Sequence, residues 1–110
     1  MYKVNEQDVA PVQMEEGVTI QTLISAEQGA PNFAMRLFKL PPLARTPLHT
    51  HPWEHEVFVL RGEGILVCED KQYSFGAGEA ILVPPNVEHR FRNIGGQELA
   101  FICVIPCKES

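Results

Sequence analysis

Short runs of apolar residues, bounded by glycine, proline or acidic residues, follow one another along most of the chain. In several runs apolar and polar positions alternate, or β-branched residues dominate, which is typical of strands. No stretch of about 12 residues or more shows a helical period. The pattern predicts an all-β sandwich or barrel of about nine short strands, with little or no helix. Strands are expected at 18–25, 33–40, 55–60, 65–69, 79–83, 87–93 and 98–105, and turns at 61–64, 69–71 and 76–78.

The strand expected at 33–40, FAMRLFKL, is apolar on both faces. Such a strand is either covered on both sides or joins a second subunit, and we predict a homodimer. Arg36 is the odd residue in this strand. It is either an edge charge in a structural ion pair, or a cation that faces the interior and meets a substrate anion.

Composition narrows the class of protein. The chain has 110 residues, a length that predicts a single domain over 1–110. Its net charge of −5 argues against nucleic acid and against an anionic membrane surface as partners. No apolar run is long enough to span a bilayer, and the first residues have no signal-peptide core, so we expect a cytoplasmic protein. Three cysteines without a CxxC pair predict no disulfide framework.

The four histidines carry the candidate chemistry. His49, His51 and His55 lie within seven residues, and His89 follows 34 residues after His55. Residues two apart on a strand point to the same side, and a fold made of hairpins could carry His89 back beside the others. A lone histidine is usually structural or solvated. Three in the spacing HxHxxxH instead favour a metal site, because neutral imidazole is the commonest protein ligand of transition metals.

Strand parity indicates what would surround such a metal. If His89 faces inward, Phe91 does too. In the last strand the opposite faces are equally apolar, and we favour the inward set that consists of Phe101, Cys103 and Ile105. The acidic and basic neighbours of the histidines, Glu56, Glu88 and Arg90, would then point outward. The interior would hold few groups for acid–base catalysis, so a bound metal would have to supply most of the chemistry.

These residues resemble the two motifs of the cupin superfamily, Gx5HxHx3-4Ex6G and Gx5PxGx2Hx3N, over 43–62 and 78–93. The first motif departs from the pattern in two places. Leu43 replaces the leading glycine, and His55 stands where the glutamate falls, unless Glu56 takes that role. In the second motif Asn86 replaces a glycine, a mild change because asparagine tolerates a left-handed backbone. The resemblance implies a small double-stranded β-helix, or jelly-roll barrel, which commonly forms homodimers.

The resemblance also implies which metal site to expect. It is strongest to small single-domain cupins in which four histidines, here His49, His51, His55 and His89, hold one ion, among them a manganese-binding subgroup. Four neutral imidazoles leave a divalent ion its full charge and leave positions open on a metal that prefers six ligands. We therefore expect one divalent transition metal per chain and favour Mn, with Fe, Ni, Zn, Cu and Co open.

Three functions fit these expectations. The first is a metal-dependent oxidoreductase, dioxygenase-like, that acts on a small apolar or aromatic compound in a pocket formed by Phe91, Phe101, Cys103 and Arg36. The second is a non-catalytic module that binds a small molecule through the metal. The third is a metal-dependent isomerase or lyase, although such cupins normally need a base in the cavity and the sequence offers no clear one.

Overall fold

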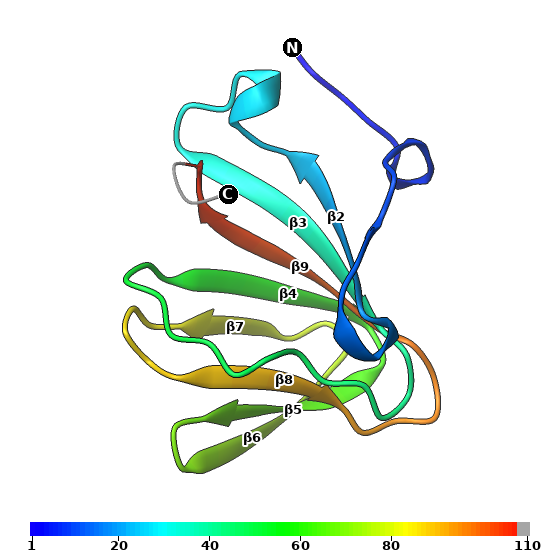
Figure 1. Cartoon of the computed structure of the whole chain (residues 1–110), viewed down its shortest axis with the longest axis vertical. Helices are drawn as coiled ribbons and strands as arrows, with labels where there is room; N and C mark the ends of the chain where they lie inside the picture. The colour runs from blue at the N-terminus through cyan, green and yellow to red at the C-terminus, as the bar shows by residue number, and fades with distance from the viewer. Residues whose placement is uncertain (108–110) are drawn as a thin grey trace.

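The computed structural model describes residues 1–107, in which strands dominate and the helical segments are three short 3₁₀ turns. Figure 1 shows most of the strands lying side by side in two sheets. One sheet has the order β1-β2-β3-β9-β4-β7, and the other has the order β6-β5-β8. The strands are β1 (Val12–Gln13), β2 (Thr19–Ile24), β3 (Phe33–Leu40), β4 (His55–Arg61), β5 (Glu63–Cys68), β6 (Lys71–Gly76), β7 (Ala80–Val83), β8 (His89–Asn93) and β9 (Leu99–Pro106). In this part of the chain, no helix has the length and apolarity that crossing a membrane requires.

The core lies between the two sheets because alternate residues of each strand point inward. From Phe101 onward β9 alternates: Phe101, Cys103 and Ile105 are buried, whereas Ile102 and Val104 are partly exposed. Val57 and Val59 of β4 face the same core, and Leu66, Phe75 and Phe91 enter it from the second sheet. The all-β barrel-like architecture that the sequence predicts is confirmed, and β9 adopts the favoured inward parity.

A segment before β4 extends the second sheet. Residues 44–49 run antiparallel to β8, with bridges from Arg45 to Arg92 and from His49 to His89. The backbone N–H of Thr46 donates to the carbonyl of Phe91 at 2.9 Å. This pairing brings the HxHxxxH segment beside the strand that carries His89, although 34 residues separate His55 from His89 along the chain.

The turn expected at 61–64 is not a hairpin. β4 pairs with β7 and β9, whereas β5 pairs with β6 and β8, so the chain passes from one sheet to the other at Gly62. Gly62 has φ +87°, which a side chain would oppose. The expected turn at 69–71, in contrast, does connect two paired strands, β5 and β6. Glycine-rich turns alone do not tell a hairpin from a crossing between sheets.

The chain's own N-terminal segment covers part of the outer face of β3. Leu37 is only 3% exposed, and its neighbour Gln21 donates from Nε2 to the carbonyls of Glu6 and Val9 at 2.7 and 2.8 Å. Lys39 on the same face pairs with Glu6 at 3.3 Å. Of the two explanations for an apolar 33–40 strand, cover from within the chain therefore accounts for this part of the face.

Candidate metal centre

A cavity of about 250 Å³ lies between the sheets, and all four histidines line it. Three come from the loop before β4 and from the start of β4, and His89 opens β8. The other walls of the cavity are largely apolar, and Phe38 and Phe101 stack there with ring centroids 5.0 Å apart. The remaining lining residues include Met14, Val18, Ile20, Thr46, Pro47, Trp53, Phe91 and Ile105. The cavity thus joins an imidazole cluster to an aromatic pocket.

The structure brings three of the four histidines to metal-binding distance. One ring nitrogen from each of His51, His55 and His89 lies within 4.8 Å of the other two. His49 stands at the exposed rim of the same cavity, with its ring centroid 5.2 Å from that of His51. Glu56 is exposed and lies outside the cavity lining. The family's glutamate position is therefore filled by His55.

Hydrogen bonds orient the two buried rings. His89 Nδ1 lies 2.9 Å from the carbonyl oxygen of Val87, which can only accept, so Nδ1 carries the proton. His55 Nδ1 contacts Cys103 Sγ at 3.2 Å, and its Nε2 is buried without a hydrogen-bond partner. These contacts at Nδ1 leave the Nε2 lone pair of His89 available. The buried Nε2 of His55, which has no partner, is available as well. Both features suit a metal ion, whose histidine ligands commonly donate the other ring N–H to a nearby acceptor.

The electrostatics of the cavity favour neutral imidazoles. Burial, reinforced by the positive charges of His89 and Arg36, lowers the pKa of His55 to about 3. Burial also lowers the pKa of His49 and of His51, and Arg36 adds to both shifts. None of the residues that line the cavity is acidic. The lowered pKa values keep the rings of His49, His51 and His55 unprotonated at neutral pH, the form that binds a metal.

The family profile described as "Cupin domain" matches residues 36–105 of this chain. The chain belongs to the cupin domain family. The solved structure of the polyketide cyclase RemF from Streptomyces resistomycificus is 36% identical, covers 97% of this cupin and superposes with a TM-score of 0.88, and the match spans 80% of that chain. Protein SchB of Streptomyces halstedii is 30% identical over 96 residues, which make up 86% of this cupin and 70% of SchB.

The match to a third relative covers less of both proteins. An uncharacterised protein of Methanocaldococcus jannaschii is 29% identical over 65 residues, 58% of this cupin, and the match spans only 52% of that protein. This chain therefore spans about half the length of that relative.

Sequence reasoning found the histidines, Phe91, Phe101 and Cys103, all of which line the cavity of this cupin. For Arg36 it left two roles open, an edge charge in an ion pair or a cation that faces the interior. In the structure Arg36 lines the cavity. Sequence reasoning missed Phe38 as the stacking partner of Phe101, and it missed the contribution of the N-terminal segment. Trp53 stacks on the ring of His51, with the two ring centroids 4.6 Å apart.

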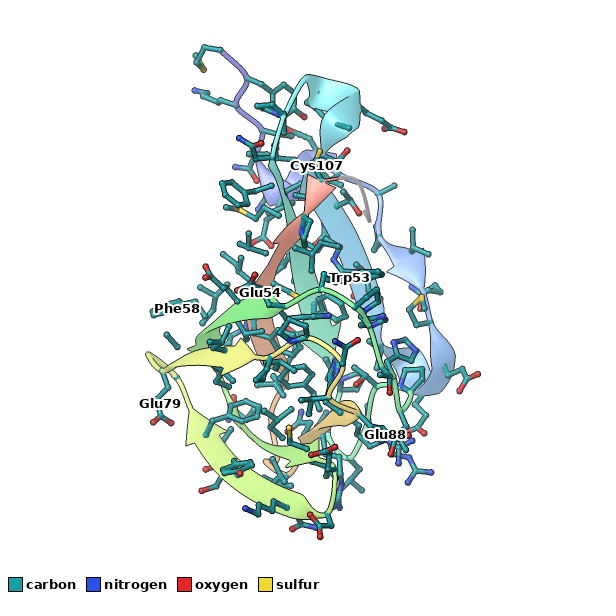
Figure 2. All side chains as sticks on the ribbon, turned by 90° about the vertical axis from the view of Figure 1, so that its left-hand side faces the viewer. Trp53, Glu54, Phe58, Glu79, Glu88 and Cys107 are labelled. Carbon is teal, nitrogen blue, oxygen red and sulfur yellow. The ribbon has the colours of Figure 1, made fainter. Side chains whose placement is uncertain are left out.

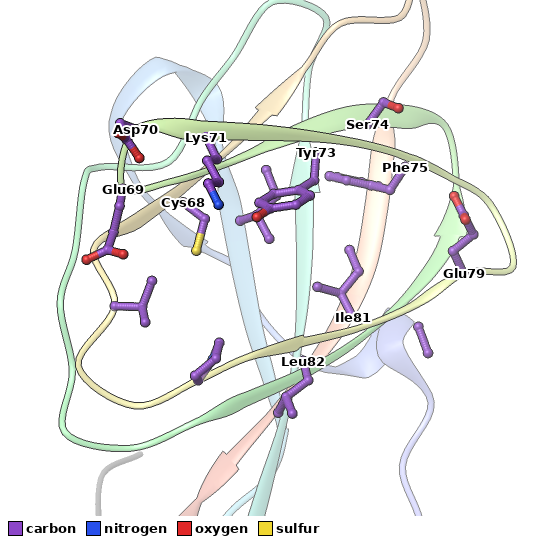
Figure 3. Close-up of a pocket in the computed structure, with 14 residues that line it drawn as sticks. Cys68, Glu69, Asp70, Lys71, Tyr73, Ser74, Phe75, Glu79, Ile81 and Leu82 are labelled. Atoms are coloured by element: carbon purple, nitrogen blue, oxygen red, sulfur yellow. The ribbon is translucent and has the colours of Figure 1, made fainter.

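A second and larger hollow of about 590 Å³ lies away from the histidines, at the seam between the two sheets. Figure 3 shows Tyr73 and Phe75 of β6 facing Ile81 of β7 across it. Glu69, Asp70 and Lys71 line one end of the hollow. It contains no histidine, and in residues 1–107 the group of side chains that could hold a metal consists of His51, His55 and His89. The chemistry of the cupin is therefore assigned to the smaller cavity.

We expect the metal-free cupin to lose stability as the pH falls. The pKa of His55 is about 3 in the folded state and about 6.5 when unfolded, so between these values the unfolded chain binds the extra proton. Stability is therefore fully present above about pH 6.5 and declines below it, by at most about 1.4 kcal/mol per pH unit from this residue. Urea unfolding across this range measures the slope. The slope should shrink in His55→Gln, and an equal slope in both proteins would contradict the assignment.

Proposed function

We propose that the protein is a metal-dependent cyclase that closes a ring within a poly-β-ketone substrate. The observation that carries the proposal is the cavity, which joins clustered imidazoles to aromatic walls and contains no carboxylate. Similarity to a polyketide cyclase along nearly the whole chain supports it. An alternating ketone chain suits such a site, because its carbonyl oxygens can meet the metal while the forming ring packs on aromatic side chains.

His51, His55 and His89 would hold the ion, and we propose His49 as the fourth ligand after a turn of its side chain at the cavity rim. When bound, a divalent ion such as Mn²⁺ supplies a Lewis acid that polarises a carbonyl oxygen. The protein residues set the conditions for this chemistry. His55 and His89 are held through Nδ1, which leaves the Nε2 of each ring available to the ion.

The proton balance of ring closure explains why the cavity needs no carboxylate. The enol form of a 1,3-diketone already presents a nucleophilic carbon. That carbon bonds to a distant carbonyl carbon of the same chain, and the enol proton ends on the oxygen of the attacked carbonyl. Loss of one water then gives the conjugated ring. No protein group is consumed, so the missing base that argued against a lyase on sequence grounds is not an obstacle.

The walls of the cavity position the reacting segment. Its volume of about 250 Å³ equals the share of roughly eight water molecules in liquid. This is room for one ring with its substituents, so the rest of a longer chain would lie outside. Phe38, Phe101 and Phe91 form the apolar face on which a flat ring can pack. By excluding water they also strengthen every polar contact made inside.

The test is turnover of a synthetic linear poly-β-ketone thioester by the protein loaded with Mn²⁺ or Zn²⁺. We expect an aromatic absorbance and a product that has lost one water, at a rate well above that of the metal-free protein. Phe101→Leu should keep the metal and lower the rate, because it removes the stacking surface. Equal rates with and without metal would reject the proposal.

An oxidative reaction is the second candidate, because four neutral imidazoles would leave the ion dicationic with positions open for an oxidant. In this case the protein would be a dioxygenase-like oxidoreductase of a small aromatic compound. Oxygen uptake with Fe²⁺- or Mn²⁺-loaded protein against catechols, diketones and alkenylphenols distinguishes the two. Ring closure without oxygen consumption supports the cyclase, and oxygen consumption with ring cleavage supports the alternative.

We also propose that the protein is a homodimer, joined through the outer face of β4 and β7. Phe58, Leu60 and Leu82 are 47%, 42% and 60% exposed there, and Phe58 points away from the barrel interior in Figure 2. Such an exposed apolar patch is typical of an interface. Light scattering should give about twice 12.3 kDa at micromolar concentration, and Phe58→Glu should give the monomer. A wild-type mass of 12.3 kDa would contradict the proposal.

A further inference from the structure

We propose that Arg36 makes the cavity selective for an anionic oxygen ligand, an enolate or a carboxylate, whose oxygens its guanidinium holds beside the histidine cluster. This inference rests on the proposed function for the identity of the natural ligand. The charge selectivity itself follows from contacts of Arg36 that do not depend on any reaction.

Arg36 is a partly buried cation that has no anionic partner among residues 1–107. Its Nε is buried and has no hydrogen-bond partner, and none of the ion pairs in residues 1–107 involves it. The polar contact it does make is weak, from Nη2 to Cys103 Sγ at 3.6 Å. Its guanidinium otherwise lies over the ring of Phe38, with Cζ 5.0 Å from the centroid. A charged side chain that lines a cavity is usually paired with an opposite charge, and residues 1–107 do not supply one to Arg36.

The rest of the cavity cannot provide that counter-charge. None of its lining residues is acidic, and the carboxylates of Glu6 and Glu16 are engaged with Lys39 and Arg45 outside it. A divalent ion held by neutral imidazoles would add further positive charge. A neutral ligand would leave the guanidinium uncompensated, whereas an anion would satisfy both positive centres. The cavity is therefore complementary to negative charge.

The contacts place the guanidinium next to the metal ligands. Cys103 Sγ touches both Arg36 Nη2 and His55 Nδ1, so one sulfur atom separates the guanidinium from a ligand ring. A ligand with two oxygens on the same side, such as a carboxylate or a 1,3-diketone enolate, could reach both the guanidinium and the metal. The planar fork of arginine suits such a pair of oxygens better than the point charge of lysine. Phe38 and Phe101 would carry the body of the ligand.

The test uses calorimetric titration of Mn²⁺-loaded protein with benzoate, with its neutral analogue benzamide, and with benzoylacetone, which enolises. We expect benzoate to bind at least about tenfold more tightly than benzamide. Arg36→Met should weaken benzoate binding about 10- to 100-fold, because a hydrogen-bonded charge pair is lost, and should leave benzamide within about twofold. Arg36→Lys should fall between the two, since it keeps the charge without the fork. Arg92→Met, at an exposed arginine of the neighbouring sheet, is the matched control and should bind as wild type.

The outcomes separate this inference from the proposed cyclase. Equal binding of all three compounds by the wild type overturns the role of Arg36, and so does binding of benzoate and benzoylacetone that is unchanged in folded Arg36→Met. The wild-type comparison decides even if the methionine variant fails to fold. Anion selectivity without ring closure of the poly-β-ketone would leave Arg36 as proposed and reject the cyclase. A response to benzoylacetone alone assigns the enolate, and a response to benzoate alone assigns the carboxylate.

Discussion

Replacing His51 by alanine should weaken binding of a divalent metal by about a hundredfold or more. Sites with four protein ligands bind zinc with roughly 10–16 kcal/mol, so one ligand accounts for about 3 kcal/mol, or two orders of magnitude in affinity. Among the three clustered histidines, His51 is the one whose replacement by alanine disturbs the fewest side-chain hydrogen bonds. One of its ring nitrogens lies within 4.8 Å of a ring nitrogen of His55 and of His89. Within residues 1–107 its side chain contacts other rings and makes no hydrogen bond, so its removal leaves no side-chain partner unpaired. Competition titration with a chelator and metal analysis measure the loss.

Two further variants sharpen this experiment. Thr50→Ala changes an exposed residue between the first two histidines and should bind metal as wild type. His49→Ala tests the proposed fourth ligand, and a loss of at least about tenfold would support it. If His49→Ala keeps full affinity but abolishes activity, the ring acts on substrate protons and the site has three histidines. Full metal affinity in His51→Ala would reject the metal centre.

The elements that sequence reasoning predicted well are those whose signals are local. The strand expected at 33–40 coincides with β3 (Phe33–Leu40), because its ends are marked by Asn32 and Pro41. Asn86, expected to replace glycine in a left-handed turn, has φ +64°. The clustering of His51, His55 and His89 also followed from spacing, since the strands between them are short and paired.

What the sequence could not provide depends on contacts between distant segments. The side to which Arg36 points is set by its register opposite Cys103 of β9, 67 residues away. The cover over Leu37 comes from residues 6–9, whose own pattern is polar and carries no strand signal. Whether His49 reaches the ion depends on a side-chain rotation at the exposed rim of the cavity, which neither spacing nor strand parity determines.

Gly62→Ala should lower the free energy of unfolding by about 3–5 kcal/mol, more than most single substitutions. Two effects add at this position. Gly62 has φ +87°, and forcing an L-residue into a left-handed backbone costs about 1–2 kcal/mol. An added Cβ would also lie 2.8 Å from the carbonyl oxygen of Glu98 and 2.9 Å from Cα of Leu99. Both are backbone atoms, one in the first residue of β9 and one in the residue before it, so this end of β9 would have to shift to make room.

Gly78 offers a matched control because it shares the backbone conformation without the clash. Its φ is +88°, and a Cβ there would meet no atom within 4 Å. Gly78→Ala should therefore cost only the conformational part, about 1–2 kcal/mol. The difference between the two variants in chemical denaturation isolates the contact at the crossing between sheets. Because β9 carries Phe101 and Cys103, a shift of its start should also weaken metal binding in Gly62→Ala but not in Gly78→Ala. Equal destabilisation in both would show that backbone conformation alone makes glycine necessary at position 62.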